Sequence, residues 1–196
     1  MKKKLILVAS PPACGKTYVS ERIAKSVGHV VYLDKDDLCA LIRASFKVAG
    51  EEVNMDGDFY ISNLRPAEYE TILHIAFSAL RFSDTVLLNA PFGKEVREAD
   101  TMRMLKDRAN ALGAELFLIW VSVPTDIIYQ RMKKRNSDRD TLKLANWDDY
   151  VSKINYTPPH ELEKVGAVDR LILFDNKDDS SSELSLKETL KIILGD

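Results

Sequence analysis

Five short runs of apolar residues recur along the chain, each about as long as a single buried β-strand. They are rich in Val, Ile, Leu and aromatic residues, as strands covered on both faces of a sheet are. The runs cover residues 4–9, 30–33, 85–90, 115–123 and 170–174. Segments with helical patterns or helix-end signals lie between and after them, at residues 17–27, 66–82, 95–112, 124–135 and 183–194. Strands that alternate with helices predict an α/β fold with a central parallel five-stranded sheet.

Two stretches interrupt this alternation. Residues 45–64 carry Gly50, Gly57 and several acids, and residues 136–149 are polar and basic. Long loops inside compact domains are usually functional or disordered. We therefore expect the first stretch to be a substrate-side excursion and the second to be a small mobile lid at about 136–149, although either could be a decorated surface loop. A chain of 196 residues fits a single domain over residues 1–196 with such a lid.

Composition narrows the classes of function. A hydrophobic fraction of 45% is too high for a disordered chain, and a formal net charge of −2 gives no sign of a nucleic-acid surface. No segment approaches the ~20 apolar residues of a membrane span, and the first apolar run ends too early for a signal peptide. Cys14 and Cys39 lack metal-ligand spacing and are expected to be reduced thiols. We expect a cytoplasmic protein with neither nucleic-acid nor membrane partners.

The segment SPPACGKT at residues 10–17 lies between the first expected strand and the first expected helix. It approximates the Walker A pattern GxxxxGK[ST], with Ser10 at the first glycine and Ala13 where many such loops have another. In such a loop, backbone N–H groups and the helix N-terminus hold phosphate, Lys16 reaches the β- and γ-phosphates, and Thr17 ligates magnesium. The pattern therefore predicts ATP and Mg²⁺ as cofactors. The residues expected to line the nucleotide here are Ser10, Pro12, Ala13, Cys14, Gly15, Lys16, Thr17 and Tyr18.

With this loop in place, the chain resembles the P-loop kinase group of polynucleotide kinases, zeta-toxin-like kinases and chloramphenicol phosphotransferases, within the AAA-type ATP-binding proteins. The resemblance extends over about residues 4–175. It rests on SPPACGKT, DKDDL at 34–38, TVLLNAPF at 85–92, and the D-x4-R-x3-R pattern at 126–135. It implies a three-layer P-loop NTPase sandwich with a small lid.

The resemblance also implies roles for single residues. The segment after the second strand supplies a carboxylate base in this group; Asp36 aligns best with it, and Asp34 and Asp37 are alternatives. An aspartate at this place could instead cap the next helix. Similar kinases clamp the transferring phosphate with lid arginines, which makes Arg131 and Arg135 candidates for both catalysis and nucleotide binding. Arg139 is a further candidate, and a solvated basic face is the alternative for all three.

One position departs from the pattern of the group. A Walker B strand ends in an acid that helps to hold magnesium, and here Asn89 stands at that place. An amide accepts a hydrogen bond from metal-bound water but adds no charge. Magnesium affinity is then expected to be lower, unless an aspartate near residue 36 supplies the charge.

The leading functional hypothesis is an ATP-dependent kinase that transfers the γ-phosphate to a hydroxyl of a small molecule. A non-catalytic nucleotide-binding regulatory protein and a polynucleotide 5′-hydroxyl kinase are the alternatives. The tetrapeptide NKDD at 176–179 matches the N-K-x-D guanine pattern, but no glycine has the preceding aspartate of a GTPase D-x-x-G switch. We therefore interpret 176–179 as an acidic turn. Cys14 precedes a helix, where the pKa of a thiol tends to fall and oxidation could block nucleotide binding. The favoured alternative is that Cys14 is simply a small residue that fits the loop.

Overall fold

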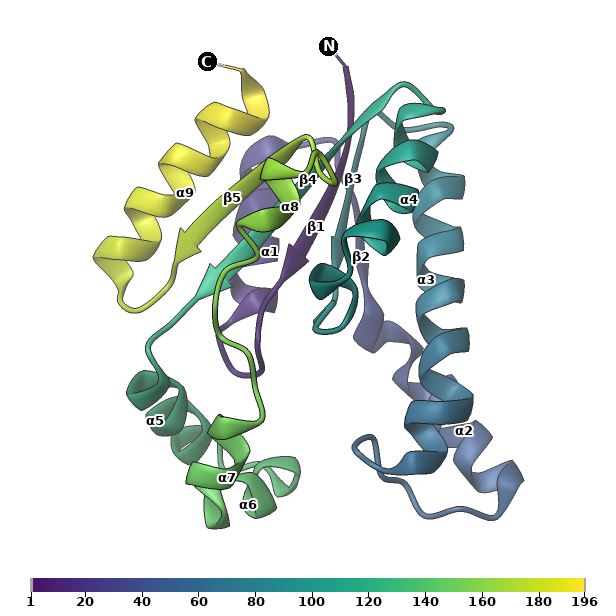
Figure 1. The fold of residues 1–196 in the computed structure, drawn as a ribbon, viewed down its shortest axis with the longest axis vertical. Coiled ribbons are helices and arrows are strands. Elements are labelled where there is room, and N and C mark those ends of the chain that lie inside the picture. Colours follow the sequence, from purple (N-terminus) through teal and green to yellow (C-terminus); the bar gives the residue numbers. More distant parts are fainter. Residues whose placement is uncertain (1, 196) are drawn as a thin grey trace.

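The computed structural model describes residues 2–195, except for the side chains of residues 138, 139 and 142 (Figure 1). Its strands are β1 (Lys3–Ala9), β2 (Val31–Asp34), β3 (Thr85–Asn89), β4 (Ala114–Ser122) and β5 (Arg170–Asp175). Its α-helices are α1 (Lys16–Val27), α2 (Cys39–Ala49), α3 (Arg65–Leu80), α4 (Ala99–Asn110), α5 (Thr125–Arg135), α6 (Asp138–Ala145), α7 (Trp147–Ser152), α8 (Glu161–Lys164) and α9 (Asp179–Leu194). Short helical turns are η1 (Lys35–Leu38), η2 (Tyr60–Leu64, a π-helical turn) and η3 (Glu95–Arg97).

The strands form one sheet in the order β2-β3-β1-β4-β5, and each of its pairings is parallel. This confirms the predicted five-stranded parallel sheet. β1 lies at the centre, and its residues 5–9 are fully buried because helices cover both faces. The register places Val8 beside Asn89 and Asn89 beside Asp34. Three strand ends next to the expected phosphate loop are thereby brought together.

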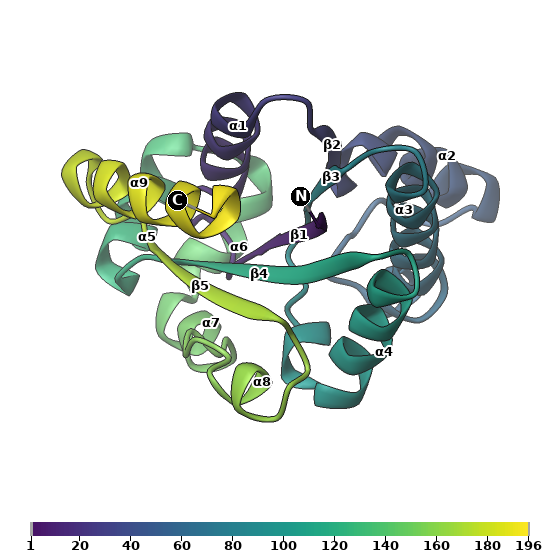
Figure 2. The ribbon, with the colours of Figure 1, turned by 90° about the horizontal axis from the view of Figure 1, so that it is seen from above.

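Helices cover the two faces of the sheet in separate layers (Figure 2). One hydrophobic core joins the sheet to α3, α4 and α8, through side chains such as Ile72, Leu105 and Leu162. The other joins it to α1, α5 and α9, through side chains such as Ile23 and Met132. The expected three-layer sandwich is confirmed.

The two stretches that interrupt the alternation contain more helix than the sequence suggested. α2 takes in residues 45–49, and its signal was present: Ile42 and Phe46 stand four apart and are both buried, and Gly50 ends the helix with φ 73°. The polar stretch 136–149 contains α6 and the start of α7. Near the C-terminus, α9 begins at Asp179, four residues earlier than expected, because Asp178 caps it by accepting a hydrogen bond from the Ser181 backbone N–H.

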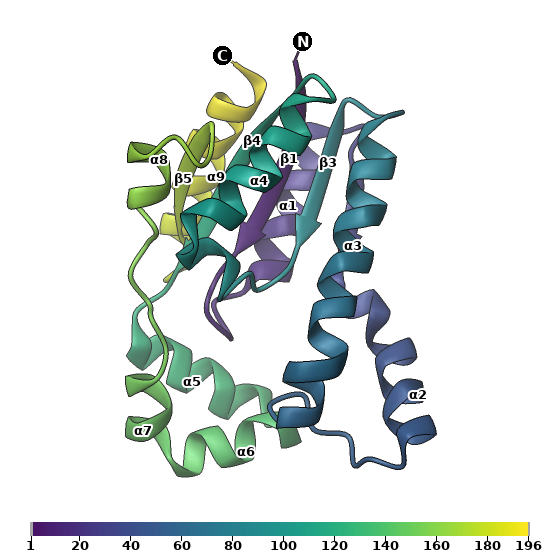
Figure 3. The same cartoon turned by 45° about the vertical axis from the view of Figure 1, so that its right-hand side comes forward.

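Two arms extend beyond the carboxyl ends of the strands: the α2 arm, residues 39–64, and the α5–α7 arm, residues 125–152 (Figures 1 and 3). The α2 arm has a small core of its own, in which Ile42, Phe46 and Tyr60 are buried. An ion pair joins the arms, with Lys143 Nζ of α6 3.2 Å from Asp56 Oδ2. Figure 3 shows α6 approaching the chain that precedes η2. Ligands of open α/β sheets bind at this carboxyl end.

Candidate active site

The loop of residues 10–15 connects β1 to α1 and contains two residues with positive φ, Ala13 and Gly15. Gly15 has φ 84°, and a Cβ at this position would lie 2.6 Å from Asn176 Nδ2. Only glycine fits without displacing that side chain. Ala13 also has a positive φ, 61°, which costs an alanine about 1–2 kcal/mol. The loop therefore stores a modest strain at Ala13 and depends on glycine at residue 15.

Asn176 and Arg131 support this loop from behind. Asn176 is 4% exposed, and its Nδ2 donates to the Cys14 carbonyl oxygen at 2.8 Å. Arg131 donates to the Asn176 carbonyl oxygen at 2.6 Å and to the Cys14 carbonyl oxygen at 3.4 Å. The segment 176–179 is therefore more than an acidic turn: its asparagine holds the loop. Sequence reasoning missed this role, because it depends on the β5–α9 connection meeting a loop about 160 residues earlier in the chain.

A polar cluster lies at the carboxyl ends of β2 and β3, against the first turn of α1. Asn89 is 3% exposed, and its Nδ2 lies 2.6 Å from Asp34 Oδ2 and 3.1 Å from Thr17 Oγ1. The Tyr32 hydroxyl donates to the same Asp34 oxygen at 3.2 Å. Asp34 Oδ1 accepts from the Asp36 backbone N–H at 2.9 Å and so caps η1. Asp34 Oδ2 thus accepts hydrogen bonds from two side chains, and Asp34 Oδ1 accepts one from a backbone N–H.

The Lys16 ammonium lies near the Asp34 and Asp36 carboxylates in a partly buried space. Burial lowers the pKa of Lys16, and the nearby Asp36 and Asp34 carboxylates oppose that shift. Burial also raises the pKa of Tyr32, and the neighbouring Asp34 carboxylate adds to that rise. The Tyr32 hydroxyl therefore stays protonated and keeps donating to Asp34.

The donor set of the cluster fits a small hard cation such as Mg²⁺, which prefers oxygen ligands. Thr17 Oγ1 and the Asp34 carboxylate share the Asn89 amide as a common neighbour. Asn89 Oδ1 is buried and has no hydrogen-bond partner within residues 2–195, so it is left to bind water or metal-bound water. No group of three or more His, Cys, Asp or Glu suited to a metal occurs among the described residues. Any cation would therefore rely on Thr17, Asp34 and phosphate oxygens.

Asp36 and Asp37 face solvent on the turn after β2. The Asp36 side chain is 65% exposed, and its Oδ1 lies 3.7 Å from Lys35 Nζ. Lys35 itself points inward, where its Nζ lies 2.9 Å from Glu68 Oε1, whose side chain is fully buried. The Tyr60 hydroxyl donates to the other Glu68 oxygen. This buried Lys35–Glu68–Tyr60 network fixes the aspartate segment to α3 and to the α2 arm, and no pattern in the sequence indicated it.

The two candidate arginines of α5 make different contacts. Arg131 reaches the phosphate loop through the Cys14 carbonyl oxygen. Arg135 instead makes a bidentate pair with Asp140, 2.8 Å at each oxygen, and ties α5 to α6. The side chain of Arg139 lies outside the described part of the chain. Of the three expected lid arginines, the structure brings Arg131 to the loop.

The remaining predicted nucleotide contacts differ in accessibility. Ser10 is buried and donates to the Pro11 carbonyl oxygen at 2.6 Å, whereas Pro12 is half-buried. Tyr18 is 52% exposed on α1, with the Arg22 guanidinium 5.2 Å from its ring centre. Thr17 is exposed at the start of the helix, where a ligand can reach its hydroxyl.

The lowered thiol pKa that the helix N-terminus suggested for Cys14 is not found. Burial raises the pKa of its thiol to about 11, although the Lys16 ammonium acts in the opposite direction. Cys14 is 1% exposed, and loss of solvent outweighs the field of a helix N-terminus. The thiol is neutral near pH 7.

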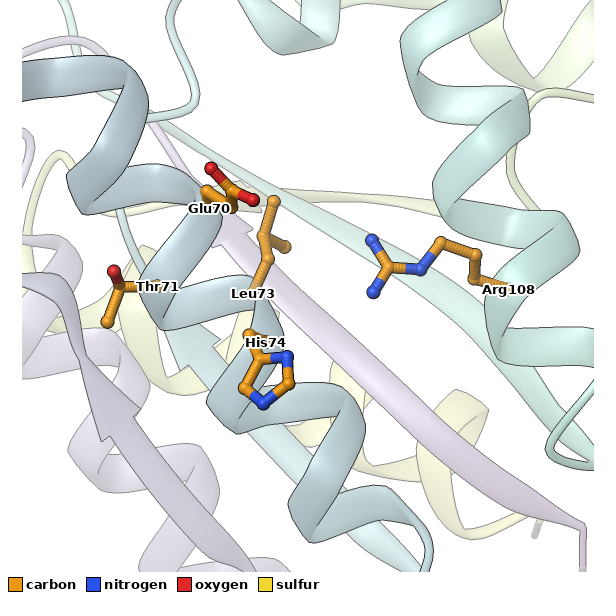
Figure 4. Close-up of a pocket in the computed structure, with 5 residues that line it drawn as sticks. All are labelled: Glu70, Thr71, Leu73, His74 and Arg108. Atoms are coloured by element: carbon orange, nitrogen blue, oxygen red, sulfur yellow. The ribbon is translucent and has the colours of Figure 1, made fainter.

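A separate hollow lies between α3 and α4 (Figure 4). Glu70, Leu73 and His74 of α3 project toward Arg108 of α4 around a space of about 320 Å³. Its charged residues are exposed, and none of the predicted site residues lines it.

Comparison with known proteins settles the family. The sequence matches the AAA domain family over residues 5–157, which is most of the chain. The chain belongs to this family. No protein of curated function matches this AAA domain protein in sequence. Among residues 2–195, no helix is both long and apolar enough to cross a membrane.

Solved structures share its fold at low sequence identity. A Chloroflexus aurantiacus protein, provisionally described as a kinase, has a TM-score of 0.67 and 16% identity, over 100% of this chain and 98% of its own. A structure of the PezAT toxin–antitoxin system of Streptococcus pneumoniae has a TM-score of 0.64 and 15% identity, and the match covers 89% of this chain and 68% of that one. A sugar kinase from Janibacter has a TM-score of 0.58 and 13% identity, and the match covers 97% of this chain and 94% of that one. The AAA domain protein therefore has the fold of the P-loop kinase group, whose members in general use ATP and Mg²⁺.

Proposed function

We propose that this AAA domain protein is a kinase that transfers the γ-phosphate of ATP to a hydroxyl group of a small molecule. The observation that carries the proposal is the cluster in which Asp34, Asn89 and Thr17 meet beside the phosphate loop. Phosphoryl transfer needs three things at one place: a cradle for phosphate, charge to hold the cation, and a carboxylate for the acceptor proton. In this proposal the loop is the cradle for phosphate, Asp34 supplies the charge for the cation, and Asp36 accepts the proton.

The cradle is the loop of residues 10–15 with Lys16. Its backbone N–H groups and the N-terminus of α1 attract phosphate oxygens, and the Lys16 ammonium adds the charge that transfer requires. The low pKa that burial gives Lys16 makes an anionic partner favourable, because phosphate oxygens would stabilise the ammonium. Arg131 and Asn176 hold the loop in position through the Cys14 carbonyl oxygen.

Asp34 takes over the charge that Asn89 does not carry. The two residues are neighbours in the β2–β3 ladder, so a carboxylate on β2 stands one strand away from the usual place on β3. When bound, Mg²⁺ neutralises the charge that develops on the phosphoryl oxygens. Thr17 and Asp34 would hold it, and Asn89 would orient Asp34 by donating to its carboxylate.

Asp36 is the proposed base. Its side chain is exposed beyond the strand ends, where an acceptor can approach, and Asp34 is already engaged by three donors. The acceptor oxygen bonds to the γ-phosphorus, the bond from that phosphorus to the bridging oxygen breaks, and the acceptor proton passes to Asp36. The stretch 136–149 is the proposed lid, and Arg131 and Arg135 of α5, which leads into it, are the proposed phosphate-binding arginines. In that scheme, Arg135 exchanges Asp140 for phosphate when the lid closes.

Asp36→Asn tests the base. Removing the proton acceptor should lower acceptor-dependent ADP release by about 10²–10⁴-fold while ATP affinity by calorimetry stays within about twofold. Asp37→Asn is the matched comparison, because Asp37 is exposed on the same turn and is the alternative base. Lys16→Ala should abolish ATP binding. Equal activity of the Asp36 and Asp37 variants would exclude Asp36 as the base.

A nucleotide-binding regulatory protein is the second candidate, and Asn89 is the observation that favours it. Without an acid on β3, the chain has one carboxylate fewer for the cation than the family pattern provides. A panel of sugar, nucleoside, antibiotic and polynucleotide acceptors separates the two. Mg²⁺-dependent ATP binding without ADP release on any of them would favour the regulatory protein.

A further inference from the structure

A pocket of about 330 Å³ lies on the opposite side of β1 from the polar cluster, where β4 and β5 end. The phosphate loop forms one wall through Pro11 and Cys14, and the chain after α7 forms another through Tyr156 and Pro158. Trp120 and Asp175 belong to the strand ends that border it. None of the residues assigned to cation or acceptor lines this space.

Two residues of these walls carry buried polar atoms that lack partners. Trp120 is 1% exposed, yet its Nε1–H has no hydrogen-bond acceptor within residues 2–195. The Tyr156 hydroxyl is buried as well and likewise unpaired in the described structure. Buried polar groups in native proteins are nearly always satisfied by protein, ligand or ordered water, so two unpaired atoms on one pocket favour an occupant that can form hydrogen bonds.

The remaining walls define the kind of ligand. Proline, valine and a neutral thiol dominate them: Pro11, Cys14, Val121, Val123, Pro124 and Pro158. Among the described residues of the lining, Asp175 is the one that carries a charge, and Lys177 already neutralises it, with Nζ 3.0 Å from Oδ2. The indole N–H only donates, so it requires an acceptor atom on the ligand, whereas a tyrosine hydroxyl can donate or accept. An apolar cavity of about 150 Å³ holds one benzene ring, so this pocket has room for about two.

We propose that this pocket is a binding site for an uncharged compound of one or two rings that carries a hydrogen-bond acceptor, held by Trp120 and Tyr156. The Arg97 guanidinium lies 4.9 Å from the Trp120 ring centre and donates to the Asn155 carbonyl oxygen at 2.9 Å. Arg97 thereby braces both the tryptophan and the chain that carries Tyr156. The residues of this site neither hold the proposed cation nor face the acceptor, and the site meets the phosphate loop at Pro11 and Cys14.

Coumarin is a suitable probe, because it has two fused rings, no charge and a carbonyl acceptor. Its affinity for the whole protein is measured by ligand-observed NMR and compared with that of coumarin-3-carboxylate. The anion should bind at least about tenfold more weakly, because the described lining offers no free cationic group for a carboxylate. Equal binding of the two compounds, or no binding of coumarin, would overturn the proposal.

Tyr156→Phe removes the hydroxyl and keeps the ring. It should weaken coumarin about fivefold, the usual worth of one hydrogen bond. Tyr150→Phe is the matched control, because its hydroxyl is also buried and unpaired in the described structure but does not line the pocket. Coumarin affinity should persist in Lys16→Ala, which separates this site from the ATP site. An equal loss in both tyrosine variants would show that the effect is not local and would overturn the assignment.

Discussion

On one side of β1, where β3 and β2 end, Asn89, Asp34 and Tyr32 form a hydrogen-bonded cluster around a carboxylate. On the other side, where β4 and β5 end, proline, valine and tryptophan border a mostly apolar pocket. The phosphate loop lies between them and contributes to both, with Lys16 near the carboxylates and Cys14 in the pocket wall. A parallel sheet allows this division, because each strand delivers the residue at its carboxyl end to the same edge.

Strand order thus separates a charged, hydrogen-bonded side of β1 from a mostly apolar side. The polar side depends on charges that must be fixed in place, so it is braced by a buried ion pair behind it. The apolar side depends on shape, and its polar atoms remain unpaired in the described structure. Three predictions test how sharp this difference is.

The largest expected effect is on the brace of the polar side. Glu68→Ala removes the nearer carboxylate from the buried Lys35 ammonium and leaves it the exposed Asp36 carboxylate at 3.7 Å, which should lower the free energy of unfolding by about 3–5 kcal/mol. Urea denaturation followed by circular dichroism measures this loss. Glu70→Ala, an exposed glutamate on the same helix, is the control and should change it by less than about 0.5 kcal/mol.

A double variant shows whether the loss arises from the orphaned charge. Lys35→Met in the Glu68→Ala background should restore most of the stability, because it removes the buried ammonium that has lost its nearer carboxylate and fills the space with an apolar chain. A loss below about 1 kcal/mol in Glu68→Ala would mean that the pair does not anchor the aspartate segment.

The second prediction concerns the thiol on the apolar side. With its pKa raised from 9.0 to about 11 by burial, Cys14 has about a hundredfold less thiolate at pH 8 than a free thiol. The rate of its alkylation by iodoacetamide should therefore keep rising beyond pH 10, as measured by mass spectrometry of the Cys14 peptide. A rate that levels off below pH 9 would place Cys14 in a polar environment and contradict the description of this wall.

Much of the fold could be predicted from the sequence, because its determinants are local. The apolar runs identify the strands, and Gly15 with Lys16 identifies the loop between the first strand and helix. The position of Asn89 followed from its place at the end of a strand. α2 was missed although Ile42 and Phe46 carried its signal, and the helices of 136–149 were missed because few of their residues are apolar.

The contacts that complete the site could not be predicted, because they join distant segments. The Asp34–Asn89 contact requires β2 to neighbour β3, which no local pattern specifies. Asn176 reaches the loop only after β5 takes its place at the sheet edge. The same holds for Glu68 behind Lys35, and for the high pKa of Cys14, which depends on how deeply the loop is buried. The sequence shows that Cys14 precedes a helix, whose field lowers a thiol pKa, but burial in the folded protein raises the pKa of Cys14 instead.

The third and smallest effect is expected from returning the missing acid to β3. In Asn89→Asp, two carboxylates would meet where the amide now donates to Asp34 at 2.6 Å. Their repulsion should lower the melting temperature without Mg²⁺, and the extra charge should raise Mg²⁺ affinity by about tenfold, measured by ATP calorimetry across a Mg²⁺ series.

The direction of the Mg²⁺ response decides between two interpretations of the polar side. If Asp34 stands in for the absent acid, a second carboxylate beside it strengthens an existing cation site, and the melting temperature recovers as Mg²⁺ is added. Asn110→Asp, which adds the same charge at the exposed end of α4, should change neither quantity. Unchanged Mg²⁺ affinity in Asn89→Asp would mean that the cluster only caps η1, and the distinction between a chemical side and an apolar side of β1 would then rest on Asp36 alone.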